Sequence, residues 1–131
     1  MNNWKRIIML YSIMFLGMTA TVLAQSTLMT YSGQNIRGKA SIQNFMLSSS
    51  NSVTLTHTNS NFAYNVPGTN IMTITYQKKN GLFYTNTGYY VNTQGNGTFY
   101  YTCTLAAGTY RLYFNTADTG SCADISGNVK G

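Results

Sequence analysis

The sequence has almost no acidic residues. Its 131 residues include eight lysines and arginines but only two aspartates, Asp118 and Asp124, and no glutamate. Glycosidases need paired carboxyl groups, and aspartic proteases need two carboxyl groups that share a proton. The tetrapeptide at residues 118–121, Asp-Thr-Gly-Ser, has the letters of an aspartic-protease loop, but the chain has no second copy of it. We interpret this tetrapeptide as a polar turn and predict that the protein is not an enzyme.

Histidine is as scarce, with His57 as its one representative. One imidazole and two carboxylates do not make a structural zinc site unless thiolates contribute. We therefore expect no metal and no cofactor, and whether Asp118 and Asp124 hold a calcium ion through loop carbonyls stays open. His57 lies among the apolar positions of an alternating segment, which favours a hydrogen-bonded core histidine over a catalytic base.

Long apolar runs are confined to the N-terminus. Residues 1–24 begin with a short basic stretch, continue with an apolar run over residues 7–16 and end in small residues at Val22-Leu23-Ala24. This is the organisation of a cleaved secretory signal peptide, and the run is shorter than the roughly 20 residues that a membrane span needs. We expect a secreted, extracellular protein whose single domain covers residues 25–131, with no stable membrane insertion after cleavage.

Cysteine occurs twice, at Cys103 and Cys122. Two cysteines in an exported chain usually pair, and we predict a disulfide between them. Such a bridge would close a loop of about twenty residues and add on the order of 3 kcal/mol in the chain-entropy model.

Helical periodicity is absent from residues 25–131, where apolar and polar residues alternate instead. We predict an all-β fold, a small antiparallel sandwich of the jelly-roll kind with seven or eight strands. Asn80-Gly81 favours a type I′ hairpin with Met72, Ile74 and Tyr76 in the core, opposite Phe83. Further strands are expected at 28–31, 39–42, 52–58, 61–66, 88–93 and 122–130.

A second hairpin is predicted at residues 98–115, with its turn at 106–109. In this register Leu105 faces Tyr110, and the alternation places one apolar face toward the core. The other face would bring together Tyr100, Arg111 and Tyr113, which we take as the candidate binding residues. Tyrosine suits this role because its ring offers an apolar face with a polar edge.

Residues 105–114, LAAGTYRLYF, resemble the pre-peptidase C-terminal type of bacterial secreted β-sandwich and related jelly-roll modules. Such modules often carry an L-x-x-G-T-Y turn that leads into a strand. The resemblance implies a non-catalytic accessory role beside an exported enzyme, sometimes with polymer binding. The resemblance does not identify any functional residue in this chain.

The expected function is therefore binding outside the cell, to a surface glycan, an anionic cell-wall polymer or a protein partner. The six basic residues after position 24 are scattered, which argues against nucleic acid as a partner. Two alternatives stay open: a cationic antimicrobial or membrane-active toxin, and a structural protein of the extracellular matrix.

Overall fold

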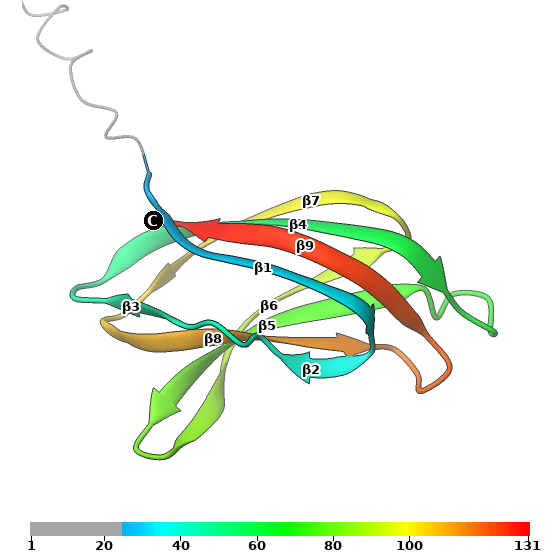
Figure 1. Ribbon diagram of the computed structural model, residues 1–131. Helices are drawn as coiled ribbons and strands as arrows, with labels where there is room; N and C mark the ends of the chain where they lie inside the picture. Colours follow the sequence, from blue (N-terminus) through cyan, green and yellow to red (C-terminus); the bar gives the residue numbers. More distant parts are fainter. Residues whose placement is uncertain (1–24) are drawn as a thin grey trace, which may run out of the picture.

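The computed structural model describes residues 25–131, so the predicted signal peptide lies outside the described residues. This segment forms nine strands and no helix (Figure 1). Consequently it contains no helix long and apolar enough to cross a membrane. The strands are β1 (Thr27–Ile36), β2 (Gly38–Ala40), β3 (Phe45–Leu47), β4 (Asn51–Ala63), β5 (Ile71–Asn80), β6 (Phe83–Gln94), β7 (Gly97–Leu105), β8 (Gly108–Thr116) and β9 (Cys122–Lys130).

The strands form two antiparallel sheets that face each other (Figure 1). Sheet A has the order β1-β9-β4-β7, and sheet B has the order β2-β8-β5-β6, with β3 also paired to β8. Most connections carry the chain from one sheet to the other, which is the connectivity of a jelly roll. The predicted all-β sandwich is confirmed, with nine strands in place of seven or eight.

The core lies between the sheets and follows the alternation of the sequence. Every second residue is buried from Met72 to Tyr76 in β5 and from Tyr110 to Thr116 in β8, because successive side chains of a strand point to opposite faces. The predicted core positions Met72, Ile74 and Tyr76 are confirmed. Sheet A contributes Met29, Val53, Leu55, Leu105, Ala123, Ile125 and Val129 from the opposite side.

The predicted hairpin at residues 98–115 is wrong. β7 pairs with β4 in sheet A, whereas β8 pairs with β5, β2 and β3 in sheet B. The short connection after Leu105 is a corner between the two layers, and the Tyr110 hydroxyl donates to the Ala106 carbonyl there (2.7 Å). Both arrangements bury the same alternate residues, so alternation alone could not distinguish a hairpin from a corner.

The predicted disulfide is not present, and Cys103 and Cys122 are free thiols. Cys103 lies opposite Val53, and Cys122 lies opposite Ala63, ten residues further along β4. At about 3.3 Å per residue this separates the cysteines by roughly 30 Å, whereas bridged cysteines need Cα atoms within about 7 Å. The register of sheet A therefore excludes an intramolecular bridge in this fold.

The predicted hairpin around Asn80-Gly81 is confirmed as β5 and β6, with Asn80 opposite Phe83. Its two loop residues are Gly81 and Leu82, and Gly81 has φ +63°. A type I′ turn needs positive φ at both loop residues, whereas Leu82 has negative φ, so the turn fits type II′ and the type I′ prediction at Asn80-Gly81 is wrong. The hairpin tip extends beyond the other strands (Figure 1), and Phe83 is 75% exposed where a core position was expected.

The segment 51–63 is a single long strand, β4, where two strands at 52–58 and 61–66 were predicted. The pairing of β4 with β9 is irregular between Ser60 and Ala63, and Asn61 has φ +49°. The strand ends at this irregularity, which leaves Tyr64 and Val66 in an exposed loop.

Candidate functional site

Strands β8, β5 and β6 give sheet B a polar and aromatic outer face. Residues in register across these strands form rows of Tyr113, Thr75 and Tyr90, and of Arg111, Gln77 and Asn86. Because neighbouring strands lie about 4.8 Å apart, the first row places its two tyrosines roughly 10 Å apart at the backbone. This face therefore offers aromatic rings beside a row of hydrogen-bonding amides.

Arg111 is held in one orientation on this face. Its Nε donates to the Gln77 Oε1 (2.8 Å), and its guanidinium carbon lies 4.2 Å from the centre of the Tyr84 ring. The Gln77 Nε2 in turn donates to the Asn86 Oδ1 (2.9 Å), and the Asn44 Nδ2 donates to the Tyr84 hydroxyl (3.2 Å). A guanidinium stacked on an aromatic ring keeps its remaining N–H donors at the edge, where a ligand can reach them.

The structure brings two of the three predicted binding residues together. Arg111 and Tyr113 lie on the outer face of sheet B, as the alternation predicted. Tyr100 lies on the outer face of sheet A, opposite Thr56 on β4, and is 72% exposed. The two layers of the sandwich therefore separate Tyr100 from Arg111 and Tyr113.

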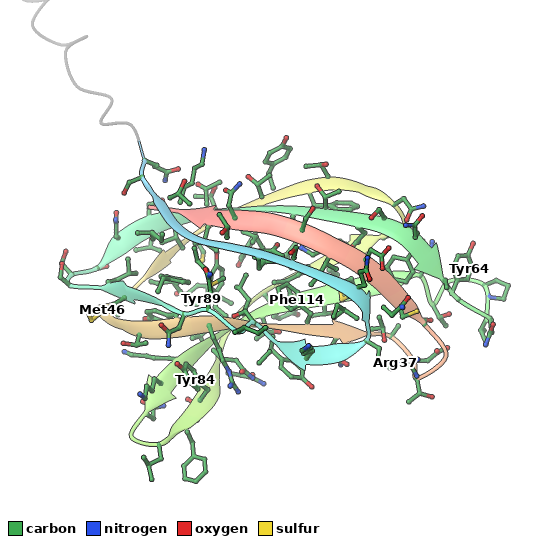
Figure 2. All side chains as sticks on the ribbon, viewed as in Figure 1. Arg37, Met46, Tyr64, Tyr84, Tyr89 and Phe114 are labelled. Carbon is green, nitrogen blue, oxygen red and sulfur yellow. The ribbon has the colours of Figure 1, made fainter. Side chains whose placement is uncertain are left out.

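Tyr84 and Gln77, which both contact Arg111 on this face, were not among the predicted binding residues. Tyr84 sits on the β5–β6 hairpin close to the turn (Figure 2). The Asn80-Gly81 turn signal located that hairpin, but the contact with Arg111 depends on pairing β5 with β8. That pairing joins segments more than thirty residues apart, which periodicity does not predict.

The segment 118–121 is a polar turn, as predicted. The Asp118 Oδ1 accepts from the Gly120 N–H (2.7 Å) and from the Ser121 hydroxyl (3.2 Å). The Asp124 carboxylate accepts hydrogen bonds from the Asn61 side-chain amide (2.9 Å) and from the Asn35 backbone N–H (3.0 Å). These two bonds hold the pKa of Asp124 below its usual range, and the bond from Asn61 has the larger effect. Each carboxylate serves its own local contacts, and residues 25–131 contain no group of three or more His, Cys, Asp or Glu side chains that could hold a metal ion.

His57 is fully buried on the inner face of β4 and belongs to a chain of polar side chains. Its Nδ1 is 2.6 Å from the Tyr31 hydroxyl, and its Nε2 is 2.6 Å from the Asn59 Oδ1. The Asn59 Nδ2 donates to the Gly95 carbonyl (3.1 Å) and to the Thr93 Oγ1 (2.8 Å). The chain joins β1 and β4 of sheet A to β6 of sheet B.

The donor and acceptor of each hydrogen bond in this chain follow from the Gly95 carbonyl, which accepts from Asn59. A carbonyl oxygen only accepts, so the Asn59 nitrogen faces Gly95 and its oxygen faces His57. The His57 Nε2 therefore carries the proton, and Nδ1 accepts from the Tyr31 hydroxyl. Burial lowers the pKa of His57, opposed in part by the Asn59 hydrogen bond. His57 is a neutral core histidine with both nitrogens engaged, as the alternation predicted, and it has no free nitrogen to act as a base.

A cleft of about 520 Å³ opens between β1 and β2, beside this chain. Tyr31, Phe114 and Ile125 contribute to its walls, and Lys39 is its one charged lining residue. The Tyr31 hydroxyl is hydrogen-bonded to His57, and the pKa of Tyr31 is raised by burial. The described residues that line the cleft include no histidine, cysteine or carboxylate.

No family model matches the sequence, and no curated protein matches it. Among solved structures, the chain is similar to the pre-peptidase C-terminal domain of a collagenase from Bacillus anthracis. The two share 19% sequence identity with a TM-score of 0.53, and the match covers 79% of this chain and 90% of that domain. The resemblance that the sequence predicted at residues 105–114 is confirmed at the level of the fold.

Proposed function

We propose that this protein is an exported, non-catalytic binding module, and that the outer face of sheet B holds a polysaccharide or another hydroxyl-rich polymer of the cell surface. The single observation that supports this most is the fixed orientation of Arg111 against Gln77 and Tyr84. A ligand that meets side chains already in place loses less conformational entropy on binding.

The chemistry of the face suits a neutral or weakly anionic polymer. Tyrosine rings can pack on the apolar faces of sugar rings, while amides and a guanidinium pair with hydroxyl groups. Both aspartates lie elsewhere, on the β8–β9 turn and on β9. An open, flat face also accommodates a chain that continues beyond the contact, unlike a closed pocket. The resemblance to accessory modules of exported enzymes agrees with this function.

Sedimentation with insoluble cell-wall polysaccharides tests the proposal. The exported protein should sediment with at least one polymer, and Arg111→Ala and Tyr90→Ala should each weaken binding about tenfold, since one buried contact contributes roughly 1.4 kcal/mol. Tyr100→Ala is the matched control, because it removes an exposed tyrosine from the other sheet. Equal losses in Tyr100→Ala and Tyr90→Ala would contradict the assignment to sheet B.

A further inference from the structure

The tip of the β5–β6 hairpin exposes two large apolar side chains side by side. Leu82 is 91% exposed and Phe83 is 75% exposed, at the end of a hairpin that extends past the rest of the sandwich (Figure 1). Met46, which is also exposed, lies at the same end of the molecule as Tyr84, and Arg37 and Tyr64 lie at the opposite end (Figure 2). An exposed apolar patch at a projecting tip usually marks a contact with a partner or a membrane.

The charges of residues 25–131 are divided between the same two ends. Both acidic residues lie at the end away from the tip, because Asp118 follows the last residues of β8 and Asp124 pairs with Ser60. The basic residues concentrate at the tip end: Lys78 and Lys79 are on the hairpin, Arg111 pairs with Gln77, and Lys130 ends β9 opposite Thr27 and Thr54. The tip end therefore carries four of the six basic residues and neither acid.

We propose that the β5–β6 tip docks reversibly on anionic phospholipid bilayers. Leu82 and Phe83 would enter the boundary between headgroups and acyl chains, while Lys79 and its basic neighbours contact anionic headgroups. Tyr84, one position further along β6, is of the residue type that favours this boundary. The docking is peripheral, and it holds the polymer-binding face close to the membrane surface.

A tryptophan placed at the tip gives a direct test. The one tryptophan of the sequence, Trp4, lies in the predicted signal peptide, so Phe83→Trp in the processed protein, residues 25–131, gives emission that reports the tip alone. Vesicles of phosphatidylcholine with phosphatidylglycerol should shift this emission to shorter wavelength, and vesicles of phosphatidylcholine alone should shift it much less. Tyr100→Trp in the same processed protein is the control and should show no shift. No shift at residue 83, or equal shifts at residues 83 and 100, would overturn the proposal.

Vesicle sedimentation provides a second measurement on variants without tryptophan at the tip. The double variant Leu82→Asn, Phe83→Asn should lower the affinity for anionic vesicles at least about tenfold, because two apolar side chains lose their burial. Val66→Asn changes an exposed apolar residue in the β4–β5 loop, close in sequence to Tyr64 at the opposite end of the molecule, and should bind as the wild type does (Figure 2). Unchanged binding by the double variant would instead leave the tip as a protein contact and refute membrane docking. Polymer binding through Arg111 is assayed without lipid, so either proposal can fail alone.

Discussion

The two sheets place their polar groups on opposite sides. Sheet A carries a polar chain on its inner face, with Tyr31, His57 and Asn59 buried in the core. Its outer face is a lattice of short hydroxyl groups that pair with one another, as Thr54 does with Thr102 (3.0 Å) and Thr58 with Thr98 (2.9 Å). Many polar side chains of sheet A therefore hydrogen-bond to one another rather than to a ligand or to solvent.

Sheet B has the reverse arrangement. Its inner face is mostly apolar, and its outer face carries longer side chains, of which Arg111, Gln77 and Tyr84 form a connected group. Long amide and guanidinium side chains extend further from the backbone than threonine hydroxyls, and they have several donors to offer. Within one sandwich of similar strands, we therefore expect sheet A to serve stability, whereas sheet B presents the proposed binding groups. Changes in the two sheets should have separable effects.

The largest expected effect is a loss of stability from Gly127→Ala in sheet A. Gly127 lies between Tyr31 and His57 in one row, and Tyr31 passes over it to reach the imidazole. A Cβ atom there would press on the Tyr31 hydroxyl and the Thr56 carbonyl oxygen. We expect the free energy of unfolding to fall by about 3 kcal/mol or more in chemical denaturation.

Gly33→Ala is the matched control for that variant. Its Cβ would meet the end of the flexible Ile36 side chain, which can move, so the expected loss is about 1 kcal/mol. Equal losses in both variants would show that the crossing of Tyr31 over Gly127 has no special role.

The next effect is a dependence of stability on pH that comes from His57. Its pKa is lowered in the folded state, so the unfolded chain, with a histidine pKa near 6.5, takes up the proton first. Stability should therefore be complete above about pH 6.5 and fall at lower pH, with a slope that approaches about 1.4 kcal/mol per pH unit. Thermal or urea unfolding between pH 7 and about pH 5 measures this dependence, and His57 is the only histidine of the sequence.

His57→Phe sharpens the same measurement. It removes the titrating group and should flatten the profile over that range, although it also lowers stability because Asn59 loses a partner. A wild-type profile that is already flat would refute the neutral, buried state of His57.

A smaller effect is expected in sheet B from Arg111→Lys. Lysine keeps the charge but loses the planar stacking on Tyr84 and the bond to Gln77, so polymer affinity should fall about threefold to tenfold. Stability should change by less than about 0.5 kcal/mol, as for most surface positions. A stability loss as large as that of Gly127→Ala would contradict the claim that Arg111 serves binding rather than stability.

No effect at all is expected from reduction. Cys103 and Cys122 are free thiols far apart along sheet A, so a reducing agent should leave the unfolding curve of the monomer unchanged. A thiol reagent should count two reactive groups in the denatured, unreduced protein. Finding none would mean that the register of sheet A is wrong.

The local features of the fold could be predicted from the sequence. Alternation identified Met72, Ile74 and Tyr76 as core residues and placed Arg111 and Tyr113 on an outer face, because the direction of a side chain depends only on its position in a strand. The turn tendencies of asparagine and glycine located the β5–β6 hairpin. These signals are all contained within a few neighbouring residues.

The pairing of strands could not be predicted in the same way. Cys103 and Cys122 are close in sequence but lie at opposite ends of β4, and Leu105 and Tyr110 flank a corner between layers. Each error assumed that segments adjacent in sequence are adjacent in space. For this reason Tyr100 was grouped with Arg111 and Tyr113, although it lies on the other sheet. The stacking of Arg111 on Tyr84 depends on strand pairings that only the structure reveals.

The central claim is that sheet B, and not sheet A, binds the polymer. Amide chemical-shift mapping by NMR, with a soluble fragment of the polymer that sediments the protein, tests it most directly. We predict that the largest shifts cluster on β5, β6 and β8 around Gln77, Tyr90 and Arg111, while Thr56 and Tyr100 stay unchanged. Shifts centred on β4 and β7 would contradict the claim.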